Sequence, residues 1–206
     1  MTNSSSDCPS LSSMSTAIVA CGALSSHIES IVSRHGLQVE VISLPAILHN
    51  TPKEISIQVD AVISRIRGNF DTIAVAYSDC GTYGALDNVL RKYSVARLGG
   101  NHCYDVFAGE KEIQRTMDNE AGTYLLTDFL VRTFYQSVIV GLGIDRYPDL
   151  LEDYFRNYSK VIWLAQSPTP ELQKLAAQAA EMIGLPLETR IVGEAKLEEQ
   201  ILTLLA

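Results

Sequence analysis

The sequence predicts an α/β protein with mostly parallel sheets flanked by helices. Two observations carry this prediction: short β-branched apolar runs alternate with helix-like segments, and the same order recurs three times along the chain. Short buried strands that alternate with helices are typical of a parallel sheet covered on its faces. We therefore expect three related β-α-β units around a central crevice.

The first unit, near 16–68, begins with the run TAIVA, which ends at Cys21. A helix follows and is closed by Gly36, and a second helix has Thr51 as a candidate N-cap with Pro52 at its first position. The expected elements are a strand over 16–20, a helix over 25–35, a strand over 39–44 and a helix from 52 to Gly68.

The second and third units, near 71–109 and 160–206, follow the same plan. The expected elements are a strand over 72–76, a helix over 85–92 and a strand over 95–98, and then a strand over 161–165, a helix over 170–183 and a strand over 187–192. Between these units we expect a helical insertion near 110–158, with helices over 122–134 and 147–158 bridged by the strand-like run Val138 to Gly143. Residues 16–206 are thus expected to form one domain behind a flexible Ser-rich tail at 1–15.

Composition excludes several classes of protein. A chain of 206 residues with 47% hydrophobic residues can bury a sizeable core. The net charge of −8 lacks the positive surface that nucleic acids require, so nucleic acid is not an expected partner. No apolar run reaches the roughly 20 residues of a membrane-spanning helix, and no secretory signal precedes the first strand. We expect a cytoplasmic protein that does not enter a membrane. The sequence leaves the oligomeric state open, and a homo-oligomer is one of the alternatives.

Four cysteines are too few for a disulfide scaffold and are expected to be reduced thiols. Cys8 lies in the Ser-rich tail and is discounted, as are His27 and His35 in the first helix. The remaining thiols and imidazoles follow the carboxyl ends of strands, where ligands bind in α/β sheets. These are Cys21, His49, Cys80, His102 and Cys103. Thiolate and imidazole ligands suit zinc or iron, so a metal site is predicted, although free cysteine is also commonly a buried apolar residue and no local CxxC or HExxH spacing imposes ligation.

The strip at 77–84 (YSDCGTYG) is the strongest local signal. Gly81 and Gly84 permit close approach of the backbone to a ligand, and a helix N-terminus would stabilise the thiolate of Cys80, which could then act as a nucleophile. Asp79 could orient a ligand, although capping of the next helix is the commoner role of such a residue.

A second loop, Gly99-Gly100-Asn101, has the composition of a loop that approaches a cofactor, and equally of a turn. The absence of GxGxxG and of a P-loop counts against a conventional nucleotide site. Asp128 and Arg132 are spaced for a helical ion pair or a substrate clamp.

Five separated blocks carry a resemblance to a known family: LPAILHNTP, YSDCGTYGALD, GGNHCYDVFAG, GTYLLTDFLVRTF and VIWLAQSPT. The chain resembles the family called domain of unknown function 1638 over nearly all of its length after the tail. The resemblance implies a context in anaerobic one-carbon metabolism, near corrinoid-dependent methyltransferase proteins, and assigns no role to any residue.

The plan of the chain is also similar to that of quinolinate synthase and the diphthamide radical enzymes. In those proteins three α/β units each offer one cysteine to an iron–sulfur cluster. Cys21 and Cys80 match the first two positions, whereas Gln166 stands where the third cysteine would be, so Cys103 would have to replace it.

Two functional hypotheses follow, with a third beside them. The first is a zinc- or iron-binding protein acting on a small molecule, as a transferase or lyase, in corrinoid-linked methyl transfer or one-carbon metabolism. The second is a metal-free binding or regulatory module that uses its glycine-rich strand-end loops. The third is catalysis by Cys80 alone as a nucleophile.

Overall fold

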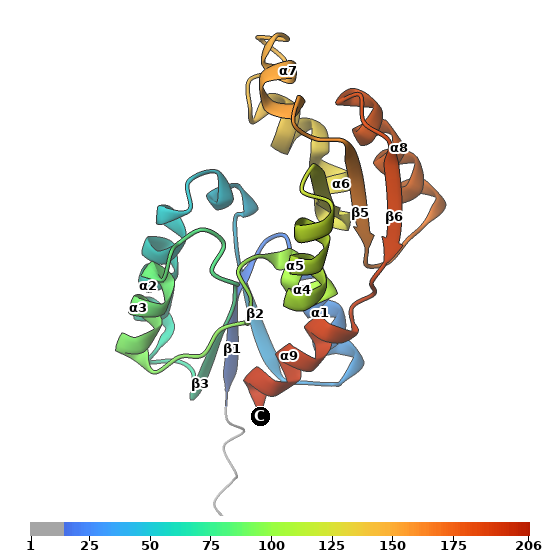
Figure 1. Cartoon of the computed structure of the whole chain (residues 1–206). Helices are drawn as coiled ribbons and strands as arrows, with labels where there is room; N and C mark the ends of the chain where they lie inside the picture. The colour runs from blue at the N-terminus through green and yellow to red at the C-terminus, as the bar shows by residue number, and fades with distance from the viewer. Residues whose placement is uncertain (1–14) are drawn as a thin grey trace, which may run out of the picture.

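The computed structural model describes residues 15–206, so Cys8 and nearly all of the expected tail lie outside the described residues. Figure 1 shows its elements. The strands are β1 (Thr16–Cys21), β2 (Val39–Leu44), β3 (Thr72–Ala76), β4 (Thr123–Thr127), β5 (Lys160–Ala165) and β6 (Leu187–Ile191). The helices are α1 (Ser25–Arg34), η1 (Ala46–Asn50), α2 (Lys53–Ile66), α3 (Ala85–Tyr93), α4 (Cys103–Ala108), α5 (Glu110–Asn119), α6 (Asp128–Phe134), η2 (Tyr135–Val140), α7 (Leu150–Phe155), α8 (Pro170–Met182) and α9 (Ala195–Leu205).

The strands form two parallel sheets of three strands each, in the orders β2-β1-β3 and β4-β5-β6. In the first sheet Ile18 of β1 is opposite Val41 of β2 and Ala74 of β3. In the second, Ile162 of β5 is opposite Leu125 of β4 and Glu188 of β6. The predicted α/β class with parallel sheets flanked by helices is therefore confirmed, while the three-unit repeat stays a prediction.

Helices cover both faces of both sheets. In Figure 1, α2 and α3 lie on one side of the first sheet, and α1 and α9 lie on the other. In the second sheet the faces alternate along each strand, because successive side chains of a strand point in opposite directions. Ile162 and Leu164 pack toward α4 and α5, whereas Val161 and Trp163 pack toward α6 and α8. Strands buried on both faces explain why these segments are continuous apolar runs.

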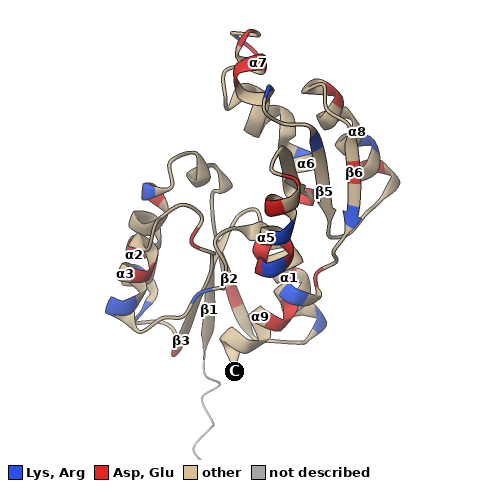
Figure 2. Ribbon diagram, viewed as in Figure 1, with Lys and Arg blue, Asp and Glu red and all other residues tan. Residues whose placement is uncertain are grey.

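The C-terminal helix α9 returns from the second sheet to the first half of the chain. Its apolar residues Leu197 and Ile201 are fully buried in the core of the first sheet. On its polar side, Glu194 accepts a hydrogen bond from Arg34 of α1, and Glu198 pairs with the same guanidinium. In Figure 2, α1 and α9 lie close together, and basic and acidic segments of the ribbon occur there.

The segment at 122–134 differs from its prediction. It was expected to be one helix, but Thr123–Thr127 is strand β4 and only Asp128–Phe134 is helical. The apolar spacing suits a helix, yet β4 pairs with β5 along its whole length, and this tertiary pairing outweighs local propensity. The Thr127 hydroxyl accepts from Leu130 N–H and begins the helix instead. The segment expected to be a helical insertion therefore supplies an edge strand of the second sheet.

Smaller differences occur at three other places. The expected strand at 95–98 is a single bridge between Val75 and Arg97, because the two glycines that follow end the pairing at once. The strand-like run from Val138 lies in the π-helix η2 and the turn after it. Thr51 does not cap α2 with its side chain, and this helix begins at Lys53. Within residues 15–206, no helix is both long and apolar enough to cross a membrane.

Candidate functional site

The first sheet has a topological switch between β1 and β3. Strand β2 lies on one side of β1, and β3 lies on the other side of β1. The connections that follow β1 and β3 therefore leave the carboxyl ends of these two strands in opposite directions. In open α/β sheets the crevice at such a point is where ligands bind. Cys21 is the last residue of β1, and Cys80 follows the end of β3 after three intervening residues. Both thiols therefore lie at the position that the topology favours for a site.

Backbone hydrogen bonds join the loop after β3 to the loop before α4. The N–H of Cys80 donates to the carbonyl of Asn101 at 2.7 Å, and the N–H of Asp79 donates to the carbonyl of Gly100 at 3.2 Å. The hydroxyl of Ser78 adds a bond to the carbonyl of His102 at 3.2 Å. Since Cys103 follows directly, these bonds fix its thiol in the same region as that of Cys80.

The imidazole of His49 faces the thiol of Cys21. Its Nδ1 lies 2.9 Å from the carbonyl oxygen of Ala46, which can only accept, so Nδ1 carries the proton in the neutral ring. Its Nε2 then has a free lone pair, and it lies 4.0 Å from Sγ of Cys21. A histidine whose Nδ1–H donates to a backbone carbonyl is oriented in the way that metal-binding histidines usually are.

Gly22 holds the loop of Cys21 against the loop of His49, because its N–H donates to the Leu44 carbonyl at 2.8 Å. A Cβ at this position would lie 2.8 Å from that carbonyl oxygen and 3.1 Å from the nitrogen of Ala46. We expect Gly22→Ala to lower the free energy of unfolding by about 1–3 kcal/mol, since backbone atoms must move apart. Urea unfolding checks this value. Gly68→Ala is the control, because a Cβ there meets nothing within 4 Å, and equal losses in the two variants would contradict the expectation.

Tyr77 lies behind the two thiols. Its side chain is fully buried, stacks on the ring of His49 at 6.1 Å between centroids, and is close enough to Cys21 to lower the pKa of that thiol. Even so, its hydroxyl makes no hydrogen bond of normal geometry within residues 15–206. Buried hydroxyls without a partner are rare in native structures and call for an explanation, such as a ligand or ion beside them.

All three thiols have raised pKa values. Burial raises the pKa of Cys21 to about 11 and that of Cys80 to about 12, and the charge of Cys21 adds to the effect at Cys80. Burial followed by the charges of Cys80 and Cys21 raises the pKa of Cys103 as well. The expected stabilisation of the Cys80 thiolate by a helix N-terminus is wrong, because Cys80 lies half-buried in the turn before α3, which begins at Ala85, and burial raises its pKa.

One cavity of about 580 Å³ adjoins this cluster. Four of the five predicted ligands line it, namely His49, Cys80, His102 and Cys103, while Cys21 lies behind His49. The facing wall belongs to β4, α6, η2 and the turn after it, and was not predicted. It consists of Tyr124, Thr127, Phe129, Leu130, Thr133, Gln136, Ser137, Val138 and Leu142. A cavity of this size suits a small organic ligand.

Asp79 does not cap α3, as the alternative prediction had it, because Gly84 is the N-cap of that helix and no side chain caps it; Asp79 instead holds the turn before the helix. Its carboxylate accepts from the N–H groups of Tyr83 and Gly84 and from the hydroxyl of Thr82. Burial alone would raise the pKa of Asp79, but these hydrogen bonds outweigh it and lower the pKa. They also hold Cys80 and Tyr83 at positive φ, a conformation that residues other than glycine adopt at a cost. Asp79 therefore shapes the turn that carries Cys80.

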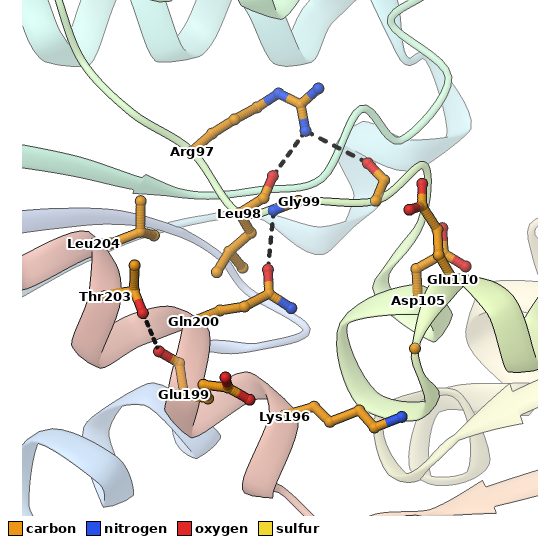
Figure 3. Close-up of a pocket in the computed structure, with 12 residues that line it drawn as sticks. Arg97, Leu98, Gly99, Asp105, Glu110, Lys196, Glu199, Gln200, Thr203 and Leu204 are labelled. Atoms are coloured by element: carbon orange, nitrogen blue, oxygen red, sulfur yellow. Dashed lines mark hydrogen bonds between the residues drawn. The ribbon is translucent and has the colours of Figure 1, made fainter.

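The glycines expected to approach a cofactor do not line the cavity beside the thiols. Gly81 lies against Pro52, and Gly84 has positive φ in the turn before α3. Gly99 and Gly100 line a separate pocket of about 500 Å³ against α9, shown in Figure 3, where the side chain of Gln200 accepts from the Gly99 N–H at 2.9 Å. Asn101 lines a third pocket and donates its N–H to Asp105.

Asp128 is neither a surface ion-pair residue nor a clamp with Arg132. Its carboxylate is buried and accepts from Nε1 of Trp163 at 2.8 Å, from the N–H of Gln166 at 3.1 Å and from that of Ser167 at 2.8 Å. Gln166, at the third cysteine position of the iron–sulfur analogy, accepts from the Asp128 N–H in return. This network is part of the core of the second half of the chain.

Within the described residues 15–206, no three His, Cys, Asp or Glu side chains are already arranged at metal-binding distances. The cluster thus brings thiols and an imidazole together without forming a closed ligand set.

Fold and site together define an α/β protein with two three-stranded parallel sheets and a cavity lined by cysteine and histidine on one wall. The chain belongs to the family described as protein of unknown function (DUF1638), whose model matches residues 43–201. The matched region contains His49, Cys80, His102 and Cys103 and begins after Cys21. No curated protein matches the chain.

Proposed function

We propose that this protein binds zinc or iron through Cys21, Cys80, Cys103 and His49 and acts on a small molecule held in the adjoining cavity. The observation that carries the proposal is the convergence of four loops, far apart in sequence, at the switch point of the first sheet. His102 adds a second imidazole at the cavity wall. Burial raises the pKa of each thiol, so the thiols are costly to ionise without a cation, and a metal ion would supply that cation.

The residues fit such a metal in three respects. Sulfur and imidazole are the ligands that zinc and iron prefer. The 4.0 Å between Sγ of Cys21 and Nε2 of His49 is close to the roughly 3.5 Å that separates sulfur and nitrogen ligands of one tetrahedral zinc ion. The unpartnered hydroxyl of Tyr77 lies where it could donate to a ligating thiolate. Iron could be held as a single ion or, with the three cysteines, as a cluster.

The reaction that we propose is transfer of a methyl group to a substrate thiol, with a corrinoid on a partner protein as donor. Binding to the metal would keep the substrate sulfur deprotonated, and its proton would pass to solvent. The sulfur would form the new bond to carbon, and the donor would retain the electron pair of the bond that breaks. The support for this reaction is the ligand chemistry together with the implied one-carbon context.

The second candidate is a metal-free small-molecule-binding module. Two observations favour it: no complete ligand set is arranged within residues 15–206, and the raised thiol pKa values keep the cysteines neutral. In this case the cavity alone carries the function.

Elemental analysis of the full chain, purified without oxygen, separates the two candidates. We expect close to one zinc or iron per chain, and a loss of most of it in Cys80→Ser and in Cys21→Ser. Cys8→Ser is the matched control and should keep the metal, because Cys8 is not one of the proposed ligands. A folded, metal-free wild-type protein that takes up neither ion when they are added would overturn the metal proposal.

A further inference from the structure

The cavity beside the thiols differs from the rest of the molecule in its charge. None of its eighteen lining residues is Asp, Glu, Lys or Arg, although these make up 19% of the chain. The pocket of Figure 3 shows the contrast within the same protein, since Arg97, Asp105, Glu110, Lys196 and Glu199 line it. A site built for a phosphate, a carboxylate or an amine normally supplies an opposite charge.

The two imidazoles do not supply that charge. The Nδ1–H of His49 is already bonded to the Ala46 carbonyl, and its Nε2 faces Cys21. Nδ1 of His102 lies 3.5 Å from the carboxylate of Asp105, so this ring already has an anionic partner within the protein. An ionic ligand in the cavity would therefore lose its hydration without gaining a partner.

The facing wall has an apolar part and a short polar row. Phe129, Leu130 and Leu142 supply the apolar part. In the polar row, the hydroxyl of Ser137 donates to Oγ1 of Thr133 at 3.0 Å, and Thr133 donates to the Phe129 carbonyl at 2.9 Å. The donors of both hydroxyls are thus used within the helix, whereas the oxygen of Ser137 remains able to accept.

The π-helical turn η2 places this row against the cavity. Its wider winding places three consecutive residues on the cavity lining, namely Gln136, Ser137 and Val138. In an α-helix the side chains of three consecutive residues would point in more widely separated directions. Gly141 accommodates the turn, because a Cβ there would lie 2.4 Å from the Ser137 carbonyl oxygen. Single π-turns of this kind are frequent at functional sites.

We infer that the ligand of this cavity is an uncharged molecule with an apolar body and one hydroxyl or amide group, which donates a hydrogen bond to Ser137 and contacts Gln136. The apolar body lies against Phe129, Leu130 and Leu142, and the other end faces Cys80 and Cys103. The inference deepens the proposed function by naming its substrate class, and it rests on the cavity part of that proposal. It applies to the cavity without a metal ion, because a bound metal would itself supply a cation.

The test uses three probes of one skeleton that differ in charge: benzyl alcohol, benzoate and benzylammonium. Binding to the full chain is measured by titration calorimetry at pH 7.5, after treatment with a chelator that removes any bound metal. We expect benzyl alcohol to bind at least tenfold more tightly than either ion. Equal or tighter binding of benzoate or benzylammonium, or no binding of benzyl alcohol up to its solubility, would overturn the inference. Metal content, measured separately, tests the proposed function alone.

Two variants place the binding in this cavity. Ser137→Ala removes the accepting oxygen and should weaken benzyl alcohol binding about fivefold, without altering the weak binding of benzoate. Thr133→Lys puts a cation on the same wall and should reverse the preference, so that benzoate binds more tightly than benzyl alcohol. Binding of benzyl alcohol that is unchanged in Ser137→Ala would contradict the assigned contact, even where Thr133→Lys fails to fold.

Discussion

The affinity of the protein for zinc should rise about 1000-fold for each pH unit between pH 7 and 9. Over this range the three thiols are protonated, because burial raises the pKa of Cys21 to about 11 and that of Cys80 to about 12, and raises the pKa of Cys103 as well. Each thiol that binds zinc as thiolate must release one proton. A higher pH lowers the cost of that release, so the affinity increases, by about tenfold per thiol per pH unit.

Competition with a chelator of known proton affinity measures this slope. The slope of the logarithm of affinity against pH counts the thiols that ligate, so three cysteine ligands predict a slope of three. Cys103→Ser should reduce the slope to two while Cys8→Ser leaves it at three. A slope near zero would show that zinc, if bound, is not held by these thiols. Because the slope does not depend on the absolute affinity, a weak site is as informative as a tight one.

The convergence of the thiols and imidazoles follows from a feature that sequence does reveal. Each of Cys21, His49, Cys80 and His102 comes after a short apolar run, and the carboxyl ends of parallel strands share one edge of a sheet. This geometry needs only the strand positions, which the sequence indicates by β-branched runs that end in glycine or proline. The chemical state of the thiols could not be predicted in the same way. Their raised pKa values depend on how far each sulfur is buried, and this burial requires the whole fold.

The facing wall was missed because its elements are decided by tertiary contacts. The apolar spacing of the β4 sequence fits a helix as well as a strand, and its pairing with β5 determines that it forms a strand. No sequence pattern predicts the π-helix η2 at Tyr135–Val140. By contrast, α9 had a usable signal that was overlooked, because Leu197, Ile201 and Leu205 recur every four residues.

Replacement of Asp128 by alanine should destabilise the protein by about 3–5 kcal/mol. The carboxylate is 2% exposed and accepts three hydrogen bonds, from the indole of Trp163 and the N–H groups of Gln166 and Ser167. Alanine leaves the buried donors of Trp163 and Gln166 without an acceptor, and a buried unsatisfied donor costs about 1–3 kcal/mol. We expect this substitution to lower stability and to leave ligand binding in the folded protein unchanged, since Asp128 does not line the cavity.

Urea unfolding, followed by tryptophan fluorescence, suits this variant because Trp163 is the only tryptophan of the chain and bonds directly to the carboxylate. Asp128→Asn keeps one accepting oxygen and should lose less, about 1–3 kcal/mol. Asp145→Ala removes an exposed carboxylate from a turn and should change stability by no more than about 0.5 kcal/mol. A loss below about 1 kcal/mol in Asp128→Ala would mean that water replaces the carboxylate. The second sheet would then not depend on this network, and neither would the start of α6, from which Phe129 and Leu130 reach the cavity.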